Sequence, residues 1–124
     1  NVTFVRKIPE RMVPVVLDPV RVRTAIKILS RQAAVAAEEA GGGAVEVTVR
    51  ELPGGFEVSV ADPGRTLPPE LREKAFVPFT PQRARGSGLG LAVVARISRE
   101  HRGNARIEER PSGGNVIVVT FLAS

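Results

Sequence analysis

The sequence lacks cysteine, tryptophan and tyrosine. Without cysteine, disulfide bonds, thiolate metal sites and cysteine nucleophiles are excluded. Aromatic residues make up 4% of the chain and all are Phe, so we do not expect a platform of rings that stacks the bases of single-stranded nucleic acid. The sequence also has no run of about eighteen apolar residues, the length that a membrane-spanning helix needs, and no recognisable signal peptide.

The chain does have enough apolar material for one core. Its 124 residues are 43% hydrophobic and 25% charged, which predicts a single domain over residues 1–124. Because the first residue is Asn1 and not Met, we expect a fragment of a longer protein. The net charge of +5 is typical of a surface that attracts a nucleotide, an anionic lipid or nucleic acid, or of an ordinary solvated basic face.

The first third of the chain predicts two short strands and a long helix. The strands cover residues 2–6 and 13–17, on either side of a Pro-Glu-Arg turn. Asp18 and Pro19 are typical of a helix start, with Asp as the N-cap and Pro at the first helical position. The three glycines 41–43 end the helix. Its apolar face is formed by Val22, Ala25, Ile26, Leu29, Ala33 and Ala36, and Arg21, Lys27 and Arg31 lie on the opposite face.

The rest of the chain predicts two hairpins separated by helices. Strands 44–51 and 56–61 flank a Pro-Gly-Gly turn, and strands 104–109 and 116–122 flank a Pro-Ser-Gly-Gly turn. A short helix over 68–74 and a long helix over 89–101 lie between the hairpins, with Val93, Val94 and Ile97 on one face of the long helix. This order predicts a two-layer α/β sandwich, in which helices cover one face of a mixed, mostly antiparallel sheet.

A glycine-rich segment directly before the second long helix is the strongest functional signal. Its residues are Gly86, Ser87, Gly88, Leu89 and Gly90. Glycines allow a ligand to approach the backbone closely, and a helix start offers free N–H groups to phosphate. The spacing fits neither a Walker loop nor a dinucleotide-binding fingerprint, so phosphate binding and a simple flexible hinge remain the two interpretations.

Two further segments can carry chemistry. Asp62 and Gly64 follow a predicted strand, where the carboxylate can accept a hydrogen bond from an adenine amino group, although Asp-Pro-Gly is also an ordinary turn sequence. Phe76 and Phe79 precede an Arg-rich loop in which Arg83 can reach a terminal phosphate. Core packing is the simpler interpretation for the two phenylalanines.

Taken together, these segments resemble the G1, F and G2 boxes of sensor histidine kinases, within the superfamily that includes gyrase, the Hsp90 chaperone, histidine kinases and MutL. The helix over 18–36 resembles the family's N box, and His101-Arg102-Gly103 resembles the His-Gly-Gly that precedes its last hairpin. The short loop with Arg83 looks like the nitrogen-regulation branch. The resemblance spans nearly the whole chain, and its strength lies in several boxes that occur in the family's order.

The resemblance implies a Bergerat fold that binds ATP and Mg²⁺ and donates the γ-phosphoryl group to a His on a separate dimerisation domain. It implies adenine at Asp62, Gly64 and Thr66, phosphates at residues 86–90, Mg²⁺ at Gln32, and charge compensation by Arg83. It also implies a response regulator as a partner, a homodimeric full-length protein and a cytoplasmic location, with a parent protein that can be membrane-anchored. No nucleic acid is expected, and the single His101 is expected to be structural.

Several positions depart from the family's pattern. Gln32 replaces the Asn that binds Mg²⁺, Thr66 replaces the second glycine of the G1 box, and Val35 replaces a basic residue that many relatives have. Ile28 cannot serve as the general base that ATP-hydrolysing relatives use. Two hypotheses about the site therefore remain open: an active catalytic domain, or a pseudokinase that signals by protein contact and in which Asn at position 32 and Gly at position 66 would restore nucleotide binding. A third hypothesis, a basic nucleic-acid-binding module, is motivated by the Arg content, and the absence of Tyr and Trp counts against it.

Overall fold

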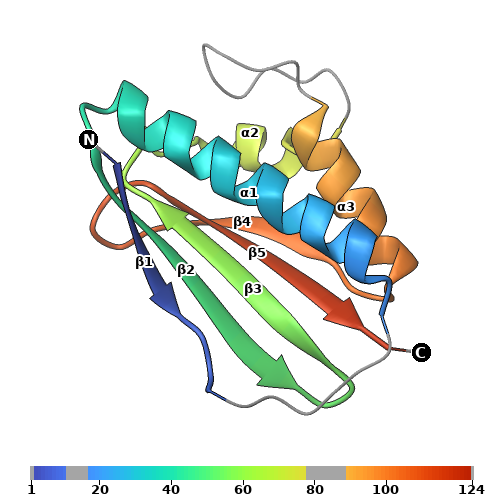
Figure 1. The fold of residues 1–124 in the computed structure, drawn as a ribbon. Helices are drawn as coiled ribbons and strands as arrows, with labels where there is room; N and C mark the ends of the chain where they lie inside the picture. The colour runs from blue at the N-terminus through green and yellow to red at the C-terminus, as the bar shows by residue number, and fades with distance from the viewer. Residues whose placement is uncertain (1, 11–16, 78–88, 124) are drawn as a thin grey trace.

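The computed structural model describes residues 2–10, 17–77 and 89–123, which form two layers (Figure 1). In this part of the chain five strands form one sheet, and helices cover one of its faces. The strands are β1 (Val2–Lys7), β2 (Gly43–Leu52), β3 (Gly55–Asp62), β4 (Ala105–Glu109) and β5 (Asn115–Leu122). The helices are α1 (Pro19–Glu39), α2 (Pro69–Lys74) and α3 (Gly90–Glu100). The predicted two-layer α/β sandwich is confirmed.

The sheet is mixed and mostly antiparallel, as predicted. Its strand order is β1-β2-β3-β5-β4, and only the β1–β2 ladder is parallel among the described strands. Both predicted hairpins form, and Gly54 in the first turn adopts a φ of 77° that favours glycine. Of the strand predicted over 13–17, residues 13–16 lie outside the described residues. Leu17 directly precedes Asp18, the N-cap of α1, and belongs to no strand.

Helix α1 begins and ends where its sequence predicts. The Asp18 carboxylate caps the first turn by accepting hydrogen bonds from the N–H groups of Val20 at 3.1 Å and Arg21 at 3.2 Å. After Glu39 the chain turns at Gly41, whose φ is 97°, and the Gly42 N–H donates to the Ala37 carbonyl at 2.8 Å. These bonds fix the direction in which β2 leaves the helix. No helix among the described residues has the length and apolar character needed to cross a membrane.

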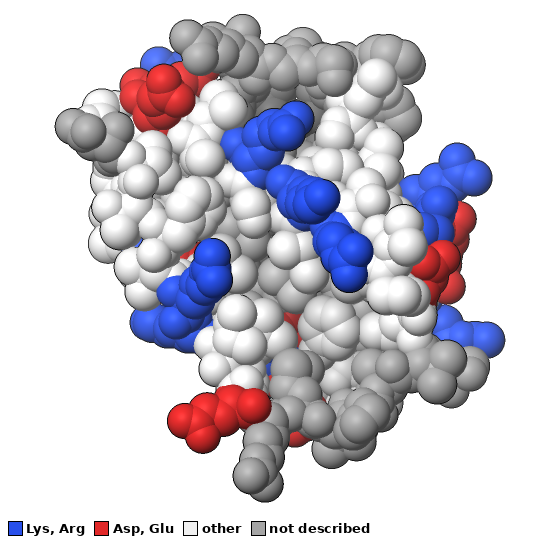
Figure 2. Space-filling model, viewed as in Figure 1, with Lys and Arg blue, Asp and Glu red and all other residues white. Residues whose placement is uncertain are grey.

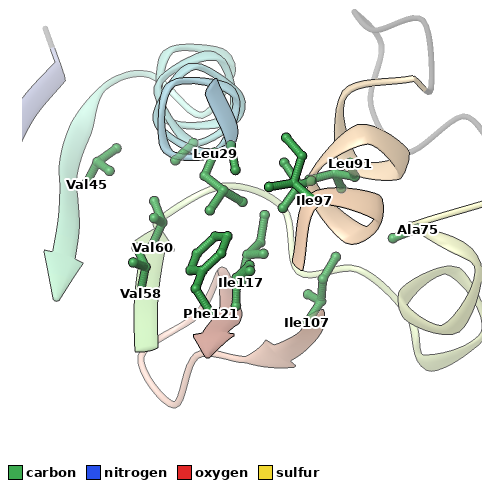
Figure 3. Close-up of a cluster of buried hydrophobic side chains, with 14 of the residues drawn as sticks. Leu29, Val45, Val58, Val60, Ala75, Leu91, Ile97, Ile107, Ile117 and Phe121 are labelled. Carbon is green, nitrogen blue, oxygen red and sulfur yellow. The ribbon is translucent and has the colours of Figure 1, made fainter. Parts of the chain in front are cut away.

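The core lies between the helices and the sheet. Figure 3 shows Leu29 of α1 and Leu91 and Ile97 of α3 above side chains from the central strands, among them Ile117 and Phe121. All five are almost completely buried, and burial of one such side chain contributes about 1.5–3 kcal/mol. The prediction that Val93 shares one face of α3 with Val94 and Ile97 is wrong as far as burial is concerned. Val93 is 40% exposed, because it lies about 100° around α3 from the buried Val94 and so faces away from the sheet.

His101 joins the two long helices at the end away from the glycine-rich segment. Its ring is buried against Phe121, with ring centroids 6.1 Å apart. The Asp18 N–H donates to its Nε2 at 3.1 Å, so Nε2 is an acceptor and the proton lies on Nδ1, which donates to the Ile97 carbonyl at 2.8 Å. The expected structural role of His101 is therefore confirmed.

Candidate nucleotide-binding site

Asp62 is the last residue of β3, and its side chain is completely buried. Side chains alternate along a strand, so Asp62 shares the helix-facing side of the sheet with the buried Val58 and Val60. Its Oδ1 accepts a hydrogen bond from the Gly64 N–H at 2.8 Å. The fold therefore fixes a carboxylate at the end of a central strand, under the helical layer.

Gly64 is the point at which the loop after β3 contacts α1. A Cβ atom added to Gly64 would lie 2.9 Å from the Ala36 Cβ and 2.7 Å from Asp62 Oδ1. Real Cβ atoms essentially never approach other atoms this closely, so the contact requires glycine. The close approach of the Gly64 backbone therefore serves packing against α1, and the contact of Gly64 with an adenine base stays a prediction.

Gly90, the first residue of α3, approaches the same helix. A Cβ atom at Gly90 would lie 3.1 Å from Ile28 Cγ2 and 3.2 Å from Gln32 Nε2. The amide of Gln32 therefore lies at the start of α3, where a helix offers free N–H groups. The predicted Mg²⁺ ligand and the end of the glycine-rich segment are brought together.

A single stripe of α1 connects these two contacts. Ile28, Gln32 and Ala36 are spaced by four residues and so lie on one side of the helix. Ile28 and Gln32 contact Gly90, and Ala36 contacts Gly64. Eight residues of helix span about 12 Å. The carboxylate loop and the start of α3 therefore lie along the same side of α1 and not on opposite sides of the molecule.

Part of the predicted site falls elsewhere or outside the described residues. Arg83, Gly86, Ser87 and Gly88 lie outside the described residues, as do Phe79 and Arg85. Leu89 is 40% exposed beside the first turn of α3. Phe76 is partly buried and packs against the core, which favours the structural interpretation of that residue. Within the described chain, no three carboxylate or imidazole side chains come together as a metal site.

Sequence reasoning missed Asn115 and Gly114, which lie beneath the Asp62 loop. Asn115 is completely buried and is the ladder partner of Asp62. Gly114 has a φ of 104°, and a Cβ atom there would lie 2.0 Å from the Asp62 carbonyl oxygen. The sequence signal was a turn glycine followed by a polar residue at the start of a mostly apolar strand, Asn115–Leu122.

Basic side chains form a row across the helical layer (Figure 2). On α1, Arg23, Lys27 and Arg31 are exposed and spaced by four residues, so they share one side of the helix. No carboxylate of the described chain forms an ion pair with any of them. The prediction that Arg21 belongs to this face is wrong, because its guanidinium pairs with Glu100 of α3.

The sequence and the fold of this chain are both similar to those of known proteins. The family model described as histidine kinase-, DNA gyrase B-, and HSP90-like ATPase matches residues 17–124. An NtrY-like sensor histidine kinase of Rickettsia bellii is 34% identical over 104 residues, which cover 84% of this chain and 17% of that protein. The nitrogen regulation protein NtrY of Azorhizobium caulinodans is 31% identical over 118 residues, which cover 91% of this chain and 15% of that protein.

Solved structures agree with these matches. The catalytic domain of histidine kinase ThkA superposes with a TM-score of 0.84 at 28% identity, covering 98% of this chain and 78% of that one. The chain spans about a sixth of the length of these curated relatives. It belongs to the family of histidine kinase-, DNA gyrase B- and HSP90-like ATPases, and the relatives it resembles are sensor histidine kinases.

Proposed function

We propose that this chain is the ATP-binding catalytic domain of a sensor histidine kinase. The observation that carries the proposal is the α1 stripe, because Gly64 beside Asp62 and Gly90 beside Gln32 both contact it. A buried carboxylate and a helix start on one side of α1 are suited to the two ends of a purine nucleotide, the amino-bearing base and the anionic phosphates.

Each end of the nucleotide has its own residues in this proposal. The adenine amino group donates to Asp62, and Gly64 and Thr66 line the base. The phosphates lie over Gly86, Ser87, Gly88, Leu89 and Gly90, where backbone N–H groups and the positive end of the α3 dipole favour negative charge.

Gln32 is the proposed protein ligand of Mg²⁺. A Cβ atom added to Gly90 would lie 3.2 Å from the Gln32 Nε2, so the Gln32 amide lies beside the start of α3, and an amide oxygen suits this oxygen-preferring cation. Bound there, Mg²⁺ offsets the charge of the phosphates. Arg83 contributes in the same way as charge develops on the leaving group, because phosphoryl transfer depends mainly on positioning and electrostatics.

The phosphoacceptor has to come from another domain. The chain contains one His, and both ring nitrogens of His101 are occupied by backbone partners. We propose that the γ-phosphoryl group moves to a His of a separate dimerisation domain, with formation of a P–N bond and release of ADP. A response regulator then receives the group. We assign the domain to the cytoplasm of a homodimeric kinase, whether or not the parent protein is anchored in a membrane.

The pseudokinase hypothesis has no specific observation in its favour. Its motivation was the departures at Ile28, Gln32, Val35 and Thr66. Two of these side chains, Ile28 and Gln32, are the ones that meet Gly90. A side chain one methylene longer than Asn therefore still reaches the start of α3.

Calorimetric titration with ATP, with and without Mg²⁺, tests the proposal. We expect a Kd in the micromolar to millimolar range that depends on Mg²⁺. In Asp62→Asn the remaining amide oxygen still accepts from the Gly64 N–H, so the melting temperature changes little. The new side-chain amino group at position 62 and the adenine amino group are both donors and cannot bond to each other. The affinity for ATP therefore falls by about tenfold or more, because an unmatched polar group costs about 1–3 kcal/mol.

Two results would count against this assignment. One is the absence of binding heat when the unmodified domain meets millimolar Mg-ATP. The other is an Asp62→Asn variant that binds ATP as well as the parent domain. The transfer step is tested separately with labelled ATP and an added dimerisation fragment, in which the fragment's His is expected to become labelled.

A further inference from the structure

The loop that follows Asp62 is bonded to the start of β5 through the side chain of Asn115. The Asn115 Oδ1 accepts from the Leu67 N–H at 2.9 Å, and its Nδ2 donates to the Arg65 carbonyl at 2.8 Å. Asn115 is completely buried, so each of these bonds satisfies a group that water does not reach. One amide thus fixes the backbone on both sides of position 66.

The Thr66 hydroxyl adds two further bonds between the same two segments. The Gly114 N–H donates to Thr66 Oγ1 at 3.0 Å, and the hydroxyl donates back to the Gly114 carbonyl at 3.4 Å. Gly114 is itself buried and lies directly against the Asp62 carbonyl. Three consecutive loop residues, 65, 66 and 67, are therefore tied to 114 and 115, and 114 in turn supports Asp62.

Close contacts on two sides limit the movement of Asp62 and of the loop that follows it. Asp62 cannot shift toward β5, because Gly114 already approaches its backbone as closely as glycine allows. The loop cannot lift toward α1, because the Gly64 contact with Ala36 leaves no space. A glycine at position 66 would remove the hydroxyl and add backbone freedom that folding or binding must restrict.

We propose that Thr66 and Asn115 are positioning residues of the nucleotide site, which hold the Asp62 loop in the shape that receives the purine. In this chain position 66 consequently requires a hydroxyl, and the glycine typical of the family weakens nucleotide binding there. The inference rests on the proposed function, since it assumes that ATP binds at Asp62. It reverses the expectation that Gly at position 66 restores binding.

Variants at position 66 of the whole chain, titrated calorimetrically with ATP and ADP, test this inference. Thr66→Ser keeps the hydroxyl and is expected to bind like the parent. Thr66→Val keeps the shape and leaves the buried Gly114 N–H without its acceptor, and Thr66→Gly removes the side chain. Both are expected to lose about tenfold in affinity. ATP and ADP should lose affinity by the same factor, because the loop meets the base and not the terminal phosphate.

Asn115→Leu provides an independent variant, and Asp18→Ala provides the control for stability. Asn115→Leu removes the hydrogen bonds from Asn115 to Leu67 and Arg65. It should weaken the binding of ATP and of ADP at least as much as Thr66→Val does. Asp18→Ala weakens the N-cap of α1 far from the loop, so it should lower the melting temperature without changing affinity for either nucleotide. Amide hydrogen exchange at Leu67 and Gly114 should quicken in Thr66→Val and stay unchanged in Asp18→Ala.

The outcomes separate this inference from the proposed function. If the parent domain binds ATP and Thr66→Gly binds it equally or more tightly, the positioning role is wrong and the proposed function stands. If Thr66→Ser loses as much affinity as Thr66→Val, the hydroxyl is not the determinant and the inference also fails. If the parent domain binds no nucleotide, the proposed function fails first and this inference fails with it.

Discussion

Gly64 illustrates how one missing carbon atom shapes the site. Its backbone lies between Ala36 of α1 and the Asp62 carboxylate, and its φ is not in the left-handed region. The requirement for glycine is therefore one of space and not of backbone conformation. The same requirement is weaker at Gly90, where the neighbours are the ends of the Ile28 and Gln32 side chains.

Gly64→Ala is expected to reduce both stability and ATP affinity. Overpacking of this kind costs about 1–3 kcal/mol, and the displaced Asp62 should bind ATP roughly tenfold more weakly. Urea denaturation and calorimetry measure the two effects. Gly90→Ala provides a milder variant for comparison. It should lose less stability, because the ends of the Ile28 and Gln32 side chains can move by a few tenths of an ångström. Equal losses of stability in both variants would contradict this account of the packing.

At the scale of elements, the two long helices are joined at the end remote from the proposed nucleotide site. Asp18 and His101 share a hydrogen bond there, and Arg21 pairs with Glu100. Gln32 lies fourteen positions after Asp18, the N-cap of α1, which corresponds to about 21 Å along the helix. This junction therefore supports the helical layer without contacting the proposed nucleotide site.

His101→Ala is expected to destabilise the domain by about 2–4 kcal/mol, because it removes buried packing and leaves the Asp18 N–H without its acceptor. Asp18→Ala should cost only about 1 kcal/mol, the usual value of an N-cap. ATP affinity of the folded fraction should stay at the parent value in both variants. A folded His101→Ala variant that no longer bound ATP would show that His101 is more than structural.

The open face of the sheet carries a charge cluster that joins β1, β2 and the last hairpin. Glu46 of β2 pairs with Lys7 of β1 at 3.0 Å and with Arg110 at 2.6 Å. Hydrogen bonds from Lys7 and then Arg110 lower the pKa of Glu46 from its ordinary value of 4.5. The parallel edge strand is thus held by a side chain as well as by its ladder.

A lowered pKa in the folded state means that the ionised carboxylate favours folding. The contribution is complete above the unfolded value of 4.5 and is lost as the pH falls through the folded pKa. Glu46→Gln should therefore reduce stability at neutral pH and flatten the dependence of stability on pH below about 5. Urea denaturation at a series of pH values measures both. Parallel curves for parent and variant would show that Glu46 does not contribute.

At the scale of the whole molecule, the basic row on α1 borders the proposed nucleotide site. Lys27 and Arg31 each precede a stripe residue, Ile28 and Gln32, so the row lies about 100° around the helix from the stripe. Together with the net charge of +5, such a row attracts anions over about one Debye length, roughly 10 Å at 0.1 M salt.

Neutralising Arg23, Lys27 and Arg31 to Gln is expected to slow the association of ATP several-fold at low ionic strength and to leave dissociation nearly unchanged. Stopped-flow binding at increasing salt measures this effect, and the difference from the parent should disappear by about 1 M salt, where screening is complete within roughly 3 Å.

The matched control removes the same charge elsewhere. Arg50 and Arg106 on the sheet and Arg102 after α3 are exposed, and changing all three to Gln lowers the net charge equally. If position near the site matters, this control should slow association much less than the variants on α1. Equal slowing would assign the effect to net charge alone.

The sequence by itself determined the local structure, and it contains most of the motifs by which the family is recognised. Asp18 and Pro19 predict the start of α1, the glycines after Ala40 predict its end, and the turn sequences predict both hairpins, because capping and turn chemistry act between residues that are close in the chain. The face of α3 was predicted less well, since Val93 and Val94 are equally apolar and only the position of the sheet distinguishes them.

Tertiary structure alone decided which distant residues meet. That Ala36 contacts Gly64 while Gln32 of the same helix contacts Gly90 depends on how α1 crosses the sheet, which no local pattern encodes. In the sequence, Thr66 is only a departure from the family's glycine. Its hydrogen-bond partner, Gly114, lies 48 residues away, so the sequence does not reveal the role of its hydroxyl. Hydrogen bonds between segments so far apart in sequence depend on the register of β3 with β5, and that register is set by packing of the whole core.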